Sequence, residues 1–251
     1  MRLIINGDDF GLNKNCSSAI ALAMQKGLIS DTTMMANGAC FDAAVALAKE
    51  QGFFDRIGIH FNLTEGEPLT RAIGRDPLFV QNGSFHKGYT KEPCRLDETQ
   101  KDMLFRELCA QAERLLSAGI AITHADSHHY IHNYTYLAPI VAEVCRKYGI
   151  GRIRLNRTLD TPLRPHVTEG RVDNGYWREQ GFVTTEHFGR LSDFRELAVP
   201  DNTEIMVHPD FDRDGRLIDR TAVADGFPCG EELDIIASLG EDISLISYRD
   251  L

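Results

Sequence analysis

The sequence predicts an α/β fold, a distorted TIM-like (β/α) barrel formed as a single domain by residues 1–251. Short apolar runs typical of strands alternate with segments of helical periodicity, and the pair repeats seven or eight times. This alternation favours a parallel sheet, and so many repeats favour a closed or distorted barrel over an open doubly wound sheet. A chain of 251 residues is long enough for one such barrel.

The expected strands are short apolar runs that contain Ile, Leu, Val and Thr. In chain order they are Leu3–Ile5, Thr32–Ala36, Ile57–Leu63, Ile122–Asp126, Arg152–Leu155, Phe182–Glu186, Glu204–His208 and Ile243–Tyr248. The expected helices lie between most of these strands, and several are followed by glycine, which readily adopts the left-handed conformation found at helix ends. They are Ser17–Lys26, Ala43–Glu50, Leu96–Ser117, Leu137–Tyr148 and Glu231–Leu239.

Three longer segments lack regular periodicity and contain many Gly, Pro and charged residues. They are Thr64–Pro93, Asn156–Gly175 and Pro209–Pro228. We expect them to be loops over one end of the fold, where long loops often form lids or binding edges.

Composition limits the partners and the compartment. The formal net charge is −10 and Lys and Arg are not clustered, which argues against nucleic acid as a partner. The chain has no apolar run of about 18 residues and no apolar signal-peptide core near Met1, so we expect no membrane span and a cytoplasmic protein. Six scattered cysteines without a Cys-x-x-Cys pair predict reduced thiols.

Two adjacent acids, Asp8 and Asp9, directly follow the first apolar run and lie between Gly7 and Gly11. One interpretation is a turn in which one Asp caps the next helix. The other is functional, with one carboxylate binding a metal ion while its neighbour takes a proton from water. The residues alone leave both interpretations open.

Histidines occur at two further strand ends. His60 lies near the end of the run 57–63, and His208 ends the run 204–208 before a proline that stops regular structure. Each could be a buried histidine with a purely structural role.

A denser group, residues 123–132, contains four histidines and one acid. In an extended segment His124, Asp126 and His128 share a face, whereas in a helix His124 pairs with His128 and His128 with His132. Either geometry can gather ligands, and a nearby carboxylate can bind the second ring nitrogen of a ligating histidine. The His-Glu-x-x-His signature of helical zinc proteases is absent.

All four groups lie at or just beyond the carboxyl end of an expected strand, where α/β barrels place their active sites. The sequence has no nucleophile elbow, Walker loop or dinucleotide-binding glycine motif. The residues therefore predict a hydrolytic metal site of carboxylates and histidines, without selecting which of them bind the ion.

Five motifs resemble those of the YdjC-like (ChbG-type) carbohydrate deacetylases, and the resemblance extends over nearly the whole chain. They are Asn-Gly-Asp-Asp-Phe-Gly-Leu-Asn at 6–13, Thr-Thr-Met-Met-Ala-Asn-Gly at 32–38, Ile-Gly-Ile-His-Phe-Asn-Leu-Thr-Glu-Gly at 57–66, Asp-Ser-His-His at 126–129 and Glu-Ile-Met-Val-His-Pro at 204–209. The resemblance implies a distorted barrel that deacetylates small N-acetylated sugars such as chitooligosaccharides, with one divalent metal ion, Mg or Zn, often as a homodimer. Tyr130 and Asp210 depart from the family's usual residues, a third histidine and a small residue.

Carried onto the matching positions, the resemblance implies metal binding by Asp9, His60 and His128. It makes Asp8 the general base and His208 the general acid. Two further candidates for contacts to the substrate or its oxyanion are Arg154 and Asp126; Arg154 could instead orient Asp8 or form a structural ion pair. The alternatives are a metal-dependent phosphoesterase or amidohydrolase on a similar barrel, and a non-catalytic sugar-binding protein.

Overall fold

A curled parallel sheet forms the centre of the protein. The computed structural model describes residues 1–90, 95–159, 169–195, 199–221, 231–233 and 243–251. The strand order is β6-β3-β2-β1-β8-β7, with β12 pairing with the first residues of β1, and every pairing in this sheet is parallel. The strands are β1 (Arg2–Phe10), β2 (Asp31–Met34), β3 (Ile57–Phe61), β6 (Ala125–Ser127), β7 (His187–Arg190), β8 (Thr203–Val207) and β12 (Ser244–Leu245).

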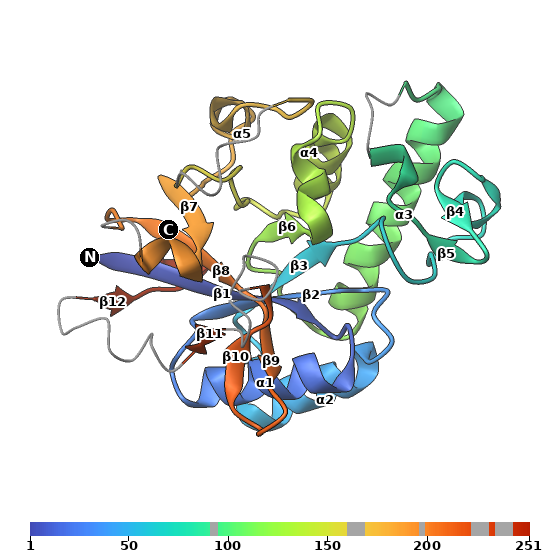
Figure 1. Ribbon diagram of the computed structural model, residues 1–251. Helices are drawn as coiled ribbons and strands as arrows, with labels where there is room; N and C mark the ends of the chain where they lie inside the picture. Colours follow the sequence, from blue (N-terminus) through green and yellow to red (C-terminus); the bar gives the residue numbers. More distant parts are fainter. Residues whose placement is uncertain (91–94, 160–168, 196–198, 222–230, 234–242) are drawn as a thin grey trace.

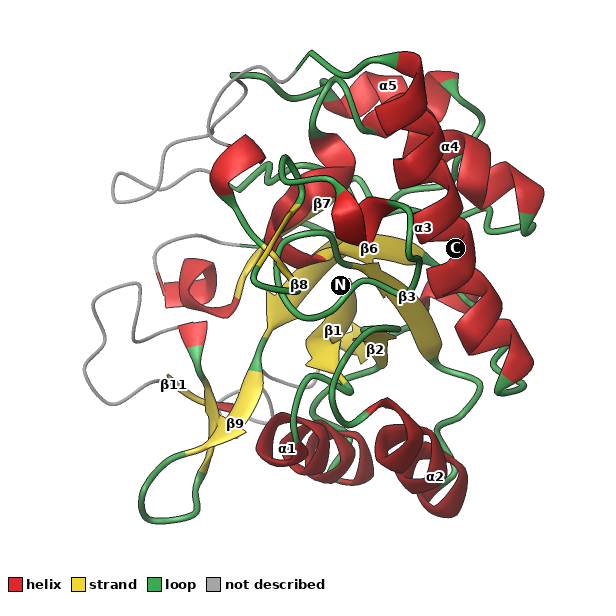
Figure 2. Cartoon of the chain, turned by 90° about the vertical axis from the view of Figure 1, so that its right-hand side faces the viewer, coloured by secondary structure: helices red, strands yellow, loops and turns green. Residues whose placement is uncertain are grey.

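Backbone pairing continues beyond β6. Isolated parallel bridges join Ala125 to Ile153 and Arg152 to Val183, and Val183 lies just before β7, the strand at the opposite edge of the sheet. The sheet therefore curls round towards its own other edge, as Figure 2 shows, and the predicted distorted barrel is confirmed. Residues 152–155 and 182–186 take part through these single bridges instead of forming the full strands that we expected.

Helices cover the outside of the curled sheet (Figure 1). They are α1 (Lys14–Gln25), α2 (Phe41–Gln51), α3 (Glu98–Ser117), α4 (Ala138–Lys147) and α5 (Asn174–Glu179). Local sequence explains their ends: the Asn13 side chain accepts from the Cys16 N–H, Asp97 and Gln100 form a capping box, and Gly52 ends α2 at φ 78°. The core lies between these helices and strand residues such as Leu3, Ile59 and Ile205, all fully buried.

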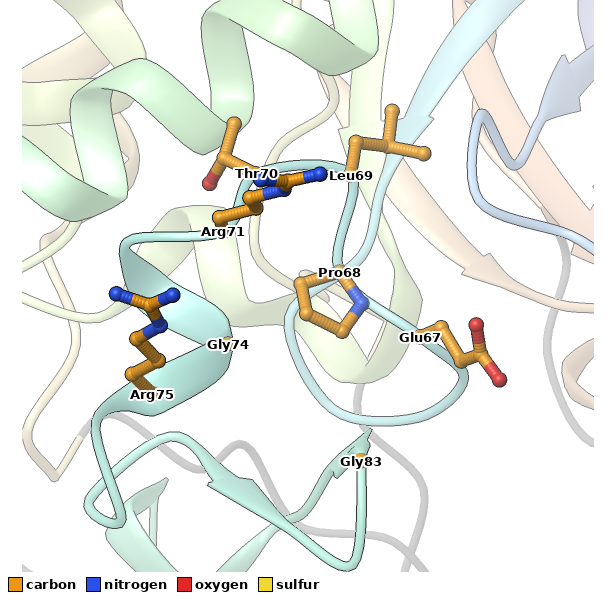
Figure 3. Close-up of a pocket in the computed structure, with 8 residues that line it drawn as sticks. All are labelled: Glu67, Pro68, Leu69, Thr70, Arg71, Gly74, Arg75 and Gly83. Carbon is orange, nitrogen blue, oxygen red and sulfur yellow. The ribbon is translucent and has the colours of Figure 1, made fainter.

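Residues 64–90 form an ordered unit instead of the loop that we expected over 64–93, of which residues 91–93 lie outside the described part of the chain. Within its described residues it contains two short 3-10 turns, η1 (Ile73–Arg75) and η2 (Gly88–Thr90), and a hairpin of β4 (Val80–Gln81) and β5 (Ser84–Phe85). Its apolar side chains Ile73, Phe79 and Phe85 are buried, but their irregular spacing gives no periodic signal in the sequence. A hollow of about 330 Å³ lies on this unit. Figure 3 shows the residues that line it, Glu67, Arg71 and Arg75 among them.

The carboxyl-terminal part also differs from expectation. Residues 209–221 contain an antiparallel hairpin, β9 (Pro209–Phe211) and β10 (Leu217–Asp219), and β11 (Glu231–Glu232) pairs with β10. The expected helix Glu231–Leu239 is wrong at its start, where β11 lies, and its residues from 234 onward lie outside the described part of the chain, as do 160–168 and 222–228 of the expected loops. The expected strand 243–248 is short: β12 is followed by the 3-10 turn η6 (Tyr248–Asp250).

Candidate active site

A pocket of about 200 Å³ lies at the carboxyl ends of β1, β3, β6 and β8. The four groups of polar residues noted in the sequence all contribute to its wall. Its chemically relevant lining residues are Asp8, Asp9, His60, His128, His208 and Arg220.

Both neighbouring acids of β1 face this pocket because the strand is irregular there. In a regular strand Asp8 and Asp9 would point to opposite faces of the sheet. The pairing of β1 with β2 shifts register between Gly7 and Phe10, and Asp9 has φ 71°, a left-handed conformation that is strained for a residue other than glycine. Such strain occurs often at functional sites.

The carboxylate of Asp9 lies between two histidine rings. Its Oδ1 atom is 3.2 Å from His60 Nε2 and 2.8 Å from His128 Nδ1, and all three side chains are buried. Within the described residues, Asp9 Oδ1 and His60 Nε2 form no hydrogen bond despite their burial. Oxygen and nitrogen donor atoms that converge without partners are the arrangement that a divalent ion requires, so these residues fit a metal site.

A second group of ligand-type atoms, on Asp8, His60 and Asp126, is equally compact. The Arg154 guanidinium, however, forms ion pairs with Asp8 (2.7 Å) and with Asp126 (2.6 Å). A cation already occupies this position, so we favour the group with Asp9.

His60 is oriented from behind the pocket. Its Nδ1 atom is 2.7 Å from Asp126 Oδ1 and 3.2 Å from Thr33 Oγ1. A carboxylate on this nitrogen places the proton there and leaves Nε2 as the acceptor that faces Asp9. The structure thus places Asp126 behind His60, away from the pocket lining, whereas the sequence suggested a contact to the substrate.

Arg154 is fully buried and fixes the second acid of the pair. It donates two hydrogen bonds of 2.7 Å to the carboxylate of Asp8, and Asn6 Nδ2 donates a third of 2.8 Å. Burial by itself raises the pKa of Asp8, but the charge and hydrogen bonds of Arg154 outweigh it and bring the pKa down to about 2. Asp8 is therefore ionised at neutral pH, and its orientation is set by the arginine.

Four buried carboxylates form ion pairs with two arginines of this site, Arg154 and Arg220. Arg154 contacts Asp8, Asp126 and Glu204, while Asp9 contacts Arg220. Burial would lower the pKa of His60, yet Asp126 and the neighbouring acids raise it to about 10. The same acids that raise the pKa of His60 also favour a bound cation, which would replace the proton on the ligating atom.

Glu204 gives the charge cluster a testable dependence on pH. Burial raises its pKa from the ordinary 4.5 to about 7, although Arg154 and Tyr248 act in the opposite direction. The folded protein therefore binds this proton more tightly than the unfolded chain does. The contribution of Glu204 to stability is complete below about pH 4.5 and is lost as the pH rises through about 7.

We accordingly expect the free energy of unfolding to depend less on pH in Glu204→Gln than in the wild type. Between about pH 5 and pH 8 the free energy of unfolding of the wild type should fall by about 2 kcal/mol more than that of the variant. Urea unfolding at both pH values measures this difference. Asp31, whose pKa burial raises to about 6, is present in both proteins and so cancels. An equal change in the free energy of unfolding between the two pH values in both proteins would contradict the expectation.

His208 lines the pocket close to both acids. Its Nε2 atom is 4.0 Å from Asp8 Oδ2 and 3.9 Å from Asp9 Oδ2, and its main-chain N–H donates to Asp219 Oδ1 (3.0 Å). Its Nδ1 atom is buried and has no hydrogen-bond partner among the described residues. The ring therefore lines the same pocket as both carboxylates.

Arg220 is a site residue that the sequence reasoning missed. It follows β10, its main-chain N–H donates to the His208 carbonyl (2.9 Å), and its guanidinium donates to Asp9 Oδ2 (2.6 Å). This contact occupies one Asp9 oxygen and leaves Oδ1 facing the histidines. No motif marks Arg220, because the contact depends on the β9–β10 hairpin folding back over β1.

Only one of the four histidines in 123–132 contacts Asp9. After β6 the chain enters a 3-10 segment, η3 (His128–Asn133), in which His129 and Tyr130 have φ 58°. His124 stacks on the Tyr248 ring at 3.8 Å, and His132 is hydrogen-bonded to Ser127. Burial lowers the pKa of both, that of His132 to about 3, so these two rings are neutral.

The two departures from the family pattern differ in position. Tyr130 lines the pocket, and its hydroxyl donates to Met206 Sδ (3.2 Å). Asp210 lies in β9 opposite Ile218 and is not among the pocket-lining residues. Of the two, Tyr130 is placed to contact a ligand.

A curled α/β barrel with an Asp-His-His group at the carboxyl ends of its strands is typical of metal-dependent hydrolases. The chain belongs to the YdjC-like protein family, whose model matches residues 2–239. It is 32% identical over 258 aligned residues to carbohydrate deacetylase 1 of Listeria innocua serovar 6a, and 32% identical over 266 residues to carbohydrate deacetylase of Listeria monocytogenes serotype 4b. Each alignment covers 100% of both chains.

A solved structure has the same fold. It is described as a putative cellobiose-phosphate cleavage protein from Enterococcus faecalis V583, with a TM-score of 0.70 at 20% identity, covering 99% of this chain and 98% of that one. In the part of this chain that the structure describes, no helix is both long enough and apolar enough to span a membrane.

Proposed function

We propose that this protein is a metal-dependent hydrolase that removes the acetyl group from small N-acetylated sugars, such as chitooligosaccharides, and releases acetate. The observation that carries the proposal is the convergence of unpartnered donor atoms on Asp9 and His60 beside an ionised Asp8. The full-length relatives named carbohydrate deacetylases support the sugar substrate. The cytoplasmic location and the homodimer remain predictions.

Asp9, His60 and His128 would bind the ion. When bound, a divalent metal polarises a carbonyl oxygen and lowers the pKa of water. One carboxylate and two imidazoles suit several divalent ions, Mg and Zn among them. Arg220 donates to Asp9 Oδ2, which leaves Asp9 Oδ1 to bind the ion.

Asp8 would act as the general base. Amide hydrolysis needs a group that accepts a proton from the attacking water. Asp8 is ionised at every physiological pH, faces the pocket, and cannot turn away because Arg154 binds both of its oxygens. We assign Arg154 the positioning of Asp8 instead of the oxyanion, because the arginine is fully buried and is not a lining residue.

His208 would act as the general acid. The amine leaving group of the sugar must gain a proton as the amide bond breaks. His208 lines the pocket, and its Nε2 atom lies about 4 Å from a carboxylate oxygen of each acid, so the ring is accessible to a ligand.

The decisive test is acetate release from N,N′-diacetylchitobiose and related N-acetyl sugars by the purified protein. We expect release that stops on addition of a chelator, returns on addition of a divalent ion, and is lost in His128→Ala. Circular dichroism would show that this variant is folded.

Two outcomes would favour the alternatives. Absence of acetate from every N-acetyl sugar, together with hydrolysis of a generic phosphate ester, would indicate the phosphoesterase. Sugar binding without any turnover would indicate a non-catalytic protein.

A further inference from the structure

His128 lies between two carboxylates, one on each ring nitrogen. Its Nδ1 atom is 2.8 Å from Asp9 Oδ1, and its Nε2 atom is 3.2 Å from Glu65 Oε2. A neutral imidazole has one N–H donor and one acceptor nitrogen. The nitrogen that binds a metal must be the acceptor, so with Nδ1 facing Asp9 the proton lies on Nε2 and points to Glu65.

The two histidines of the proposed metal site therefore have a similar arrangement, with a carboxylate on the ring nitrogen that faces away from Asp9. His60 has Asp126 on the nitrogen that faces away from Asp9, at 2.7 Å, and His128 has Glu65 in the corresponding place. A carboxylate in this position fixes the tautomer and the ring orientation and makes the ligand more basic. The supports differ in exposure: Asp126 is fully buried, whereas the Glu65 side chain is 41% exposed.

The main chain of Glu65 is held in a defined turn. Its carbonyl accepts hydrogen bonds from Asn62 Nδ2 (2.7 Å) and Asn37 Nδ2 (3.2 Å), and its N–H donates to Asn62 Oδ1 (3.3 Å). Asn62 directly follows β3, the strand that carries His60. The turn thus connects the position of Glu65 to the strand that supplies a metal ligand.

We propose that Glu65 is a positioning residue for His128, which accepts the Nε2–H and keeps Nδ1 free for the ion. The inference rests on the proposed metal site. A competing interpretation is a second ion, because ligand atoms of Glu65, His128 and His129 also lie within 4.8 Å of one another. We favour positioning because a neutral His128 cannot offer both nitrogens, and His129 Nδ1 is already 2.8 Å from Thr64 Oγ1.

Calorimetric titration of the metal-free protein with Zn²⁺ alone tests this role without relying on activity. We expect one ion per wild-type chain, and a dissociation constant 10- to 100-fold weaker in Glu65→Gln. Glu65→Asp, which keeps the charge, should recover part of the affinity. Glu67→Gln is the matched control, since Glu67 lines the hollow of Figure 3 and should leave the dissociation constant unchanged.

Several results would overturn the inference. A Glu65→Gln protein that is folded by circular dichroism and binds Zn²⁺ within twofold of the wild type would exclude positioning. Two ions per wild-type chain, one of them lost in His129→Ala, would instead establish a second site. A wild-type chain that binds no Zn²⁺ would overturn the metal site of the proposed function, and this inference with it.

Discussion

Replacing Asp8 by asparagine is expected to lower kcat for acetate release by about 10²- to 10⁴-fold, the usual contribution of a general base. The side chain keeps its size and its place in the pocket, but it can no longer accept a proton from water. Asp8 is hydrogen-bonded to Arg154 and is not one of the proposed metal ligands around Asp9. The dissociation constant for Zn²⁺ should therefore change by less than about threefold.

Two further variants distinguish the general-base role of Asp8 from the roles of nearby acids. Asp9→Asn should show the reverse pattern, with metal affinity lost, while Asp210→Asn, outside the pocket lining, should resemble the wild type. The measurements are steady-state acetate release and zinc titration on the same preparations. If Asp8→Asn loses metal and keeps its kcat at saturating Zn²⁺, the group of Asp8, His60 and Asp126 binds the ion instead.

Arg154→Met is expected to destabilise the protein by about 3–5 kcal/mol, the cost of leaving buried charges without a partner. Arg154 is the cation shared by Asp8, Asp126 and Glu204, and all of these side chains are buried. Methionine fills similar space but leaves three buried carboxylates to repel one another. The deficit should shrink as the pH falls, because these acids then take up protons.

Urea unfolding at neutral pH measures this effect. The matched control is Arg152→Met, two residues earlier, whose guanidinium donates, among the described residues, to the main-chain oxygens of Arg249 and Leu251. We expect the control to lose less than about 1 kcal/mol. Arg154→Lys should be intermediate, since lysine retains the charge without the planar fork. A loss below about 1 kcal/mol in Arg154→Met would contradict the proposed charge balance.

The barrel and the location of the site could be predicted from local patterns. Short apolar runs such as 57–63 and 204–208 indicate strands, and the end of each run indicates the carboxyl end of the strand. The individual roles could not be predicted in this way. Proposing Asp9 instead of Asp8 as the metal ligand depends on a register shift in β1 and on φ 71° at Asp9, and residue types alone predict neither. Choosing His128 among four histidines depends on the kink at His129.

Non-local packing accounts for the remaining gaps. Arg220 reaches Asp9 only because the β9–β10 hairpin returns over α1 and β1, so its place depends on contacts across most of the chain. The unit 64–90 lacks periodicity because it is held by separate contacts: Glu107 on α3 accepts from the N–H groups of Leu69 and Thr70. A sequence pattern reveals residues that recur at a regular spacing, but it does not reveal a single long-range contact.

The central position of β1 has a consequence for how the protein acquires activity during synthesis. β1 precedes every other described strand along the chain, yet Leu3 pairs with Thr203 of β8 and with Leu245 of β12. Pairing between such distant residues is slow to form and leaves apolar strands exposed until the partner arrives. Asp8 and Asp9 thus leave the ribosome long before His208 and Arg220, so a nascent or truncated chain contains the first half of the site without the second.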